Sequence, residues 1–355
     1  VQLGFDRDQT DREAGRCLEC GLCCECYQCV DACLAQAVDH SMLPVEKDIS
    51  VGSVILSPGC DTFDPSDLEE YYHYSSNPNV MTSLEFERVL SASGPTMGHL
   101  VRLSDNKEPK KIAWLQCVGS RDTHRCGNSY CSSVCCMYAV KDAMIAKEHS
   151  KEDLDCVIFN MDMRTIGKDY EQYYLRAKEK EGVRFVRGRV HSVDEVNGSS
   201  DLRVRFADEQ GRICHEDFDM VVLSVGLMIS KETIRLAERL GVDLLGNNFA
   251  KTNPFVPVES SRPGVYVSGL FQGPKDIPSS VTEASAAACL AGANIADARD
   301  TETRSIDVPE QRDVTDEEPR IGVFVCNCGI NIGGVVDVPA VAEYAATLPN
   351  VVYTD

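Results

Sequence analysis

Cysteine is the residue type whose number and spacing most clearly indicate chemistry in this chain. Its 355 residues include 18 cysteines, most of them in two short clusters. In the first cluster the candidate ligands follow a three-residue spacing that ends with a gap of four: Cys17, Cys20, Cys23, Cys26, Cys29 and Cys33. The last four match the ferredoxin pattern Cys-x2-Cys-x2-Cys-x3-Cys, although Leu34 replaces the usual proline. This spacing lets successive thiolates reach different corners of one iron–sulfur cube, and the sequence leaves open which cysteine serves which cluster.

The second cluster contains four cysteines that we expect at the junction of a strand and a helix: Cys117, Cys131, Cys135 and Cys136. In a dinucleotide-binding unit this junction carries a glycine-rich loop, and the pyrophosphate lies at the helix N-terminus. An iron–sulfur cluster with its thiolates is also negatively charged, so the same helix end suits it. We therefore predict a cluster here instead of a nicotinamide site. Inert buried thiols are the alternative, and Cys126, in the middle of the loop, is the weakest candidate.

Structural zinc is a further alternative for the first cluster, because zinc sites also use Cys-x2-Cys pairs. Zinc takes four ligands, whereas residues 17–33 hold seven cysteines. Iron–sulfur ligation is therefore the preferred interpretation. Near the C-terminal end, Cys326 and Cys328 form a Cys-x-Cys pair, which is a weak pattern by itself.

The elements around the second cluster predict an α/β protein with a parallel sheet. Residues 111–116 and 154–160 have the pattern of strands, and residues 132–148 between them have the pattern of a helix. Residues 51–59 and 219–226 each form an apolar strand that ends at a glycine, one before and one after this unit. That layout is typical of a flavoprotein with two dinucleotide-binding domains.

The predicted domain organisation has five parts. Residues 1–40 form a cysteine-rich, ferredoxin-like head, and residues 41–110 and 227–300 are portions of a flavin domain. Residues 111–226 form an inserted Rossmann-like domain that carries a cluster. Residues 301–320 are acidic and polar and form a linker, and residues 321–355 begin a further iron–sulfur domain.

Glycine-rich turns indicate where a flavin would be held. Residues 262–288 read as a strand, a glycine turn and a helix of small residues, a junction whose backbone N–H groups can approach a cofactor closely. The candidate cofactor contacts in the chain are Gly59, Gly226, Gly269, Gln272, Gly273, Lys275 and Ile277.

The net charge of −21 argues against a nucleic-acid-binding protein, because an acidic surface repels phosphates. No run of about 18 apolar residues occurs, so we expect no direct membrane insertion. We also see no signal peptide, and cysteines clustered between ordinary cores favour metal ligation in the cytoplasm over secreted disulfides. The expected partners are proteins.

Residues 114–122, 130–139, 271–278 and 324–331 together resemble the A-type subunits of heterodisulfide reductases. The resemblance implies a thioredoxin-reductase-like core with FAD and several [4Fe–4S] clusters, one of them held by Cys117, Cys131, Cys135 and Cys136. It implies that Lys141, just over one turn beyond the paired cysteines, lies near the flavin; a solvated helix residue is the alternative. The implied partners are the other heterodisulfide reductase subunits and hydrogenase or ferredoxin-type electron donors.

The chain departs from this family in lacking the glycine-rich FAD fingerprint before residue 17, and residues from 321 onward resemble the family's amino-terminal domain. We therefore expect a fragment of a tandem protein, in which Cys326 and Cys328 would be the first ligands of another cluster. The predicted function is electron transfer between FAD and clusters, with bifurcation at split potentials as a possible form of it. A thioredoxin-reductase-type dithiol oxidoreductase and a zinc-stabilised interaction scaffold are the alternatives.

Overall fold

The computed structural model describes residues 6–15, 27–196 and 198–355, and these residues form two compact units that divide after Arg299. Candidate ligands Cys17, Cys20, Cys23 and Cys26 therefore lie outside the described residues. The chain before the first sheet contains two short helices, α1 (Arg7–Gly15) and α2 (Gln28–Ala32).

A five-stranded parallel sheet forms the larger part of the first unit, with the strand order β3-β10-β4-β5-β6. Its strands are β3 (Val80–Thr82), β4 (Lys111–Val118), β5 (Asp155–Asn160), β6 (Arg184–Arg187) and β10 (Met220–Val225). The predicted strands at 111–116, 154–160 and 219–226 are thus confirmed to within two residues. Successive residues of a strand point to opposite faces, so Ile112 and Trp114 face one core while Ala113 and Leu115 face the other.

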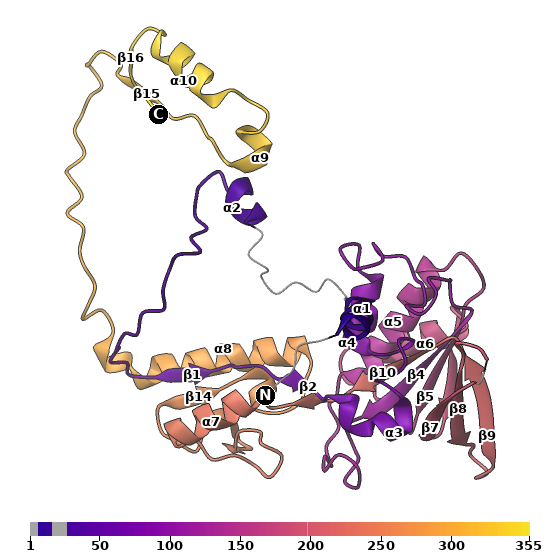
Figure 1. The fold of residues 1–355 in the computed structure, drawn as a ribbon. Coiled ribbons are helices and arrows are strands. Elements are labelled where there is room, and N and C mark those ends of the chain that lie inside the picture. The colour runs from indigo at the N-terminus through magenta and orange to yellow at the C-terminus, as the bar shows by residue number, and fades with distance from the viewer. Residues whose placement is uncertain (1–5, 16–26, 197) are drawn as a thin grey trace. The chain divides into compact units, whose positions relative to one another are not determined.

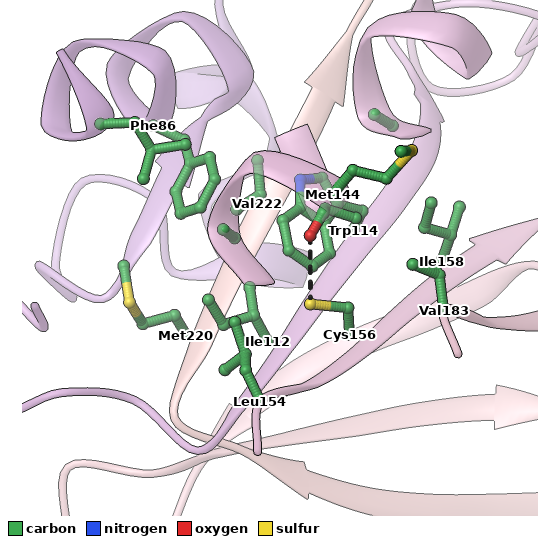
Figure 2. Close-up of a cluster of buried hydrophobic side chains, with 14 of the residues drawn as sticks. Phe86, Ile112, Trp114, Met144, Leu154, Cys156, Ile158, Val183, Met220 and Val222 are labelled. Carbon is green, nitrogen blue, oxygen red and sulfur yellow. Dashed lines mark hydrogen bonds between the residues drawn. The ribbon is translucent and has the colours of Figure 1, made fainter. Parts of the chain in front are cut away.

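Helices α4 (Ser83–Leu90), α5 (Cys135–His149) and α6 (Tyr170–Glu179) cover the first face of this sheet (Figure 1). The core beneath them is centred on Trp114, which is fully buried and meets Phe86 edge to face at a ring-centroid distance of 5.5 Å (Figure 2). In the same core the Cys156 thiol donates to the Ala143 carbonyl oxygen of α5. This hydrogen bond and the apolar surroundings of Cys156 indicate that the cysteine has a structural role.

An antiparallel three-stranded sheet covers the second face, formed by β7 (Val190–Glu195), β8 (Leu202–Ala207) and β9 (Ile213–Phe218). Phe159 of β5 packs against Phe206 and Phe218 there. The short helix α3 (Glu69–Tyr72) borders the same core. Both faces of the parallel sheet are therefore buried, as its apolar strands require.

The second sheet of this unit has the order β1-β14-β13-β12, and helix α8 (Ile277–Asn294) lies along it (Figure 1). Its strands are β1 (Val54–Leu56), β12 (Thr252–Asn253), β13 (Val256–Ser260) and β14 (Val265–Val267). The remaining elements are the pair β2 (Asp61–Thr62) and β11 (Leu227–Met228), and helix α7 (Lys231–Leu240). The predicted buried strand at 51–59 is only three residues long here, and Ile55 in its centre is exposed because β1 has a neighbour on one side only.

The two sheets divide the chain differently from the predicted ranges. β3 lies within residues 41–110 but pairs in parallel with β10, through Val80 opposite Val221. The sequence between β2 and β4 thus belongs mostly to the five-stranded sheet, while β1 and residues 227–299 build the other sheet. The predicted range 41–110 is split because β3 supplies the hydrogen-bonding partner for one edge of β10.

The second unit, residues 300–355, contains a small two-stranded parallel sheet and two helices. Its elements are β15 (Ile321–Val323), α9 (Gly329–Ile332), α10 (Val338–Ala346) and β16 (Val351–Thr354). Residues 304–314, before this sheet, have no helix or strand and are exposed. Among the residues that the structure describes, no helix is long and apolar enough to cross a membrane.

Candidate functional site

The four cysteines of the second cluster surround the C-terminal end of β4 and the N-terminal end of α5. Cys117 is the penultimate residue of β4, Cys135 and Cys136 begin α5, and Cys131 lies in the loop before the helix. Cys117, Cys135 and Cys136 are buried, whereas Cys131 is half-buried. Negative charge on an ionised Cys117 or Cys131 would raise the pKa of both Cys135 and Cys136, because the thiols are neighbours. The structure therefore brings the four predicted ligands together.

The backbone around these thiols adopts conformations that side chains rarely take. Cys117 has a φ of 64°, Arg121 of 54° and Ser133 of 66°. Each is a left-handed conformation in a non-glycine residue, and such conformations persist only where the surroundings enforce them. All three residues lie between the end of β4 and the start of α5, where the predicted ligands are found.

Buried serines and a glycine hold these loops in place. The Ser120 and Ser132 hydroxyls are 2.6 Å apart, and Ser132 Oγ accepts the Leu227 backbone N–H at 2.9 Å. A Cβ on Gly226 would lie 2.2 Å from Ser120 Oγ, so no larger residue fits between them without a shift. Gly226, predicted as a flavin contact, is thus placed against the cysteine loops.

Burial raises the pKa of all three buried thiols, and that of Cys136 reaches about 11. The positive charge of the neighbouring Arg121 guanidinium partly offsets this effect for Cys117. Arg121 also pairs with Asp162, whose carboxylate lies 3.4 Å from Nε of Arg164. Ionising these thiols therefore requires a compensating positive charge, which a metal centre supplies.

The first turn of α5 is open to an anionic group. Its N-cap residue, Val134, provides no side-chain hydrogen bond to the free N–H groups of the helix. No three His, Cys, Asp or Glu side chains in the described part of the chain converge closely enough to hold a single metal ion. A four-iron cluster takes each thiolate at a different iron, so its ligands need not meet at one point. The residues present, four thiols at an uncapped helix end, fit such a cluster.

Lys141, just over one turn further along α5, borders a cavity of about 580 Å³ whose wall also includes Val134, the residue before Cys135. The cavity wall includes Ser133, Met137, Tyr138, Tyr170 and Tyr173. Tyr138 donates its hydroxyl to the Val225 carbonyl oxygen at 2.7 Å, which joins this wall to the end of β10. The lining is largely aromatic and apolar, which suits a planar ring system, and its charged members are two lysines and two aspartates: Lys141, Lys168, Asp169 and Asp276.

The side chain of Lys141 is not a freely solvated one. Its ammonium group bonds to the Glu87 carboxylate on α4 and lies 3.7 Å from Oδ1 of Asp142. Burial lowers the pKa of Lys141, but the bond to Glu87 and the charge of Asp142 outweigh it, so this pKa lies above its ordinary value. Lys141 is therefore a permanent cation at the cavity.

The turn predicted to contact a flavin is organised around Lys275. The Lys275 ammonium donates to the Gly269 and Gly273 carbonyl oxygens at 2.7 and 2.8 Å and to Gln272 Oε1 at 2.8 Å. It also pairs with Glu283 of α8 at 3.1 Å, and Glu283 accepts the Gly269 N–H. Lys275 and Gln272 thus bind the turn itself.

The other predicted flavin contacts are more exposed. Gly59 has a φ of 76° and open space beside its Cα, so a ligand can approach it closely. Ile277 begins α8, is 80% exposed and borders the cavity near Lys141. Gly59 and Ile277 therefore remain candidates for contact with a cofactor.

Of the remaining candidate ligands, Cys29 lies in α2 and Cys33 directly after it, and Cys29 Sγ is 3.9 Å from Nε2 of His40. In the second unit, Cys326 and Cys328 are exposed with their sulfur atoms 3.0 Å apart.

Sequence reasoning missed Glu87, Asp142, Arg121 and Asp162. Glu87 and Asp162 reach the site from positions distant in sequence, so no local pattern identifies them. Asp142 could have been noticed, because an α5 of mainly apolar residues places an acidic residue next to Lys141.

Comparison with known proteins finds one matching family model and several relatives. Residues 33–288 match the family model of the pyridine nucleotide-disulphide oxidoreductases. The chain is 41% identical over 278 residues to the A-type subunit of the H(2):CoB-CoM heterodisulfide,ferredoxin reductase from Methanothermobacter thermautotrophicus, covering 78% of this chain and 41% of that protein. It is 44% identical over 257 residues to its counterpart in the H(2)/formate:CoB-CoM heterodisulfide,ferredoxin reductase of Methanococcus maripaludis, covering 72% and 39%.

A further relative is the A-type iron-sulfur subunit of the CoB--CoM heterodisulfide reductase from Methanocaldococcus jannaschii, 41% identical over 77% of this chain and 40% of that protein. The chain thus spans about two fifths of the length of these curated relatives. Among solved structures, a thioredoxin reductase of T. acidophilum is similar with a TM-score of 0.44 and 14% identity, covering 68% of this chain and 65% of that one. A likeness of this degree adds nothing about function.

Proposed function

Since this chain belongs to the pyridine nucleotide-disulphide oxidoreductase family and is a relative of the A-type heterodisulfide reductase subunits, we propose that it transfers electrons between FAD and [4Fe–4S] clusters in a similar complex. The observation that carries the proposal is the set of four cysteines at the β4–α5 junction. It occupies the position at which a dinucleotide-binding domain would hold a pyrophosphate.

Bound at this junction, a cluster would accept and release single electrons at a potential set by the charges and hydrogen bonds around its sulfur atoms. Cys117, Cys131, Cys135 and Cys136 would hold it, with Arg121 and the first N–H groups of α5 as the nearby positive groups. The apolar side chains beneath α5 exclude water from its protein-facing side.

The proposed place of the second cofactor is the cavity whose wall includes Ser133 and Val134, the two residues before Cys135. Tyr138, Tyr170 and Tyr173 supply flat apolar walls, and Lys141 supplies the cation. Flavin contact at Gly59 and at the turn from Gly269 to Gly273 completes the proposed set. Lys275 contributes indirectly, by fixing the carbonyl groups of that turn.

The wider setting follows from the relatives' names. We propose further heterodisulfide reductase subunits as partners, because the relatives are themselves subunits of such reductases. Hydrogenase or ferredoxin-type proteins are the proposed electron donors, and electron bifurcation is a proposed mode of working. The acidic surface implied by the net charge of −21 favours docking on basic patches, with association rates that fall as salt rises.

A cysteine replacement with a matched control tests the proposal. Cys135→Ala, in the anaerobically purified full-length protein, should lose about one cluster's worth of iron and the corresponding visible absorption. Cys156→Ala is the control, because Cys156 is equally buried but bonds to a backbone carbonyl in the core. Iron that is unchanged in Cys135→Ala, or lost equally in both variants, would contradict the assignment.

A further inference from the structure

The carboxyl group of Asp142, next to Lys141, is buried without a hydrogen-bond partner among the described residues. Asp142 has 0% exposed side chain, and neither of its oxygens has a hydrogen-bond partner among the described residues. Removing an ionised carboxylate from water without pairing is strongly unfavourable. The cation near it in the described chain is the Lys141 ammonium at 3.7 Å, and that group is already bonded to Glu87.

Two carboxyl groups thus compete for one ammonium group. Glu87 is half-exposed and makes the shorter contact, whereas Asp142 is enclosed by protein. Of two carboxyl groups this close, the buried one is the group that keeps a proton. Burial and the Glu87 charge raise the pKa of Asp142 to about 8, although Lys141 acts in the opposite direction.

The groups facing Asp142 come from three helices. α4 contributes Glu87, α5 contributes Lys141 and Tyr138, and α6 contributes Tyr173. The strands beneath α5 present apolar side chains and the Cys156 thiol, which is bonded to the Ala143 carbonyl. Lys141 is therefore the only cationic side chain in this set of described neighbours, and its position decides whether Asp142 holds a proton.

We propose that Asp142 is a proton-coupled positioning residue: a negative charge that forms in the cavity draws the Lys141 ammonium away from Asp142, and Asp142 then takes up one proton from solvent. The inference rests on the proposed function only for the occupant, a flavin that becomes negatively charged on reduction. The electrons come from the reductant of the flavin. The proton goes from water to a carboxylate oxygen of Asp142, and its positive charge compensates the negative charge that forms in the cavity.

The coupling has a pH window. Below about pH 7 Asp142 already holds its proton, and charge in the cavity changes nothing there. Above pH 8 it is ionised while Lys141 rests nearby, and it binds a proton when Lys141 moves toward the cavity. The wild type should therefore take up one more proton per flavin reduction than Asp142→Asn above pH 8, and the same number at pH 6.

The test compares wild type, Asp142→Asn and Glu148→Gln in the full-length, flavin-containing protein. Glu148 is an exposed acidic residue of the same helix, so its variant controls for a change of helix charge. Flavin content is measured first, and the flavin midpoint potential is then titrated from pH 6 to pH 10. We expect the wild type and Glu148→Gln to share one profile, and Asp142→Asn to coincide with them at pH 6 and to lie at higher potential above pH 8.

Each outcome decides a separate point. A protein without flavin refutes the proposed function, whereas bound flavin with superimposable profiles in all three proteins refutes the coupling. Infrared titration with labelled aspartate tests the proton itself, and the wild-type spectrum alone is enough to overturn the inference. A protonated carboxyl band that disappears near pH 8 and is missing in Asp142→Asn supports the inference, and its absence in the wild type at pH 6 overturns it.

Discussion

Replacing Lys275 by Met should release the turn from Gly269 to Gly273 while preserving most of the side-chain volume. The ammonium group makes three hydrogen bonds to this turn and pairs with Glu283, and the two side chains are only 11% and 16% exposed. Removing one member of such a pair leaves a buried charge uncompensated, which costs about 3–5 kcal/mol in enclosed sites. Because both groups retain some contact with water, we expect a loss of roughly 3 kcal/mol of local stability.

The assay is hydrogen exchange of peptides that contain residues 265–276. A loss of roughly 3 kcal/mol corresponds to an increase in exchange rate of about a hundredfold, since each 1.4 kcal/mol is tenfold. The double variant Lys275→Met/Glu283→Gln should exchange more slowly than Lys275→Met, because it has no unpaired carboxylate at position 283. Lys251→Met is the control, since Lys251 is 61% exposed and pairs with Asp243 at 3.8 Å. Exchange within threefold of wild type in Lys275→Met would show that Lys275 does not hold the turn.

Three further outcomes are expected. The pKa of Asp142 is near 3.8 in the unfolded chain but about 8 in the folded protein. Between these values the stability of the wild type should therefore fall, relative to Asp142→Asn, by at most about 1.4 kcal/mol per pH unit as the pH rises. Urea midpoints from pH 5 to 8, followed by Trp114 fluorescence, measure this difference, and parallel curves for the two proteins would contradict the prediction. Phe86→Ala should destabilise the core by about 3–5 kcal/mol in the same assay, because a fully buried ring that contacts Trp114 leaves a cavity. NADH or NADPH alone should not bleach the flavin of the full-length protein in stopped-flow mixing, because cysteines replace the phosphate-binding loop after β4; rapid bleaching without a protein partner would refute this.

The sequence was most informative where the contacts are local. The βαβ pattern identified β4, α5 and β5 because apolar strands buried on both faces differ clearly from the helix between them. The spacing of Cys131, Cys135 and Cys136 placed three thiols at one helix start, and the preceding strand end placed Cys117 beside them. Short-range patterns therefore sufficed for the framework of the candidate site.

Long-range contacts were not predictable in the same way. The pairing of Lys141 with Glu87 joins residues 54 positions apart across two helices, and no spacing rule connects them. The same reason explains why the pairing of β3 with β10 was not predicted, since β10 lies far along the chain. Lys275 was expected to face a cofactor, but only the three-dimensional turn shows how many carbonyl oxygens surround its ammonium group.

The strand order also has a consequence for biosynthesis. β10 lies between β3 and β4 in the sheet but is synthesised last of the five strands, about 90 residues after Cys136. At 5–20 residues per second, the ribosome needs roughly 5–20 s to cover that distance. Until residue 227 emerges, Ser132 lacks the Leu227 N–H and the loops lack Gly226. In the nascent chain, Cys117, Cys131, Cys135 and Cys136 thus lack these supports for several seconds, until the last strand joins the sheet.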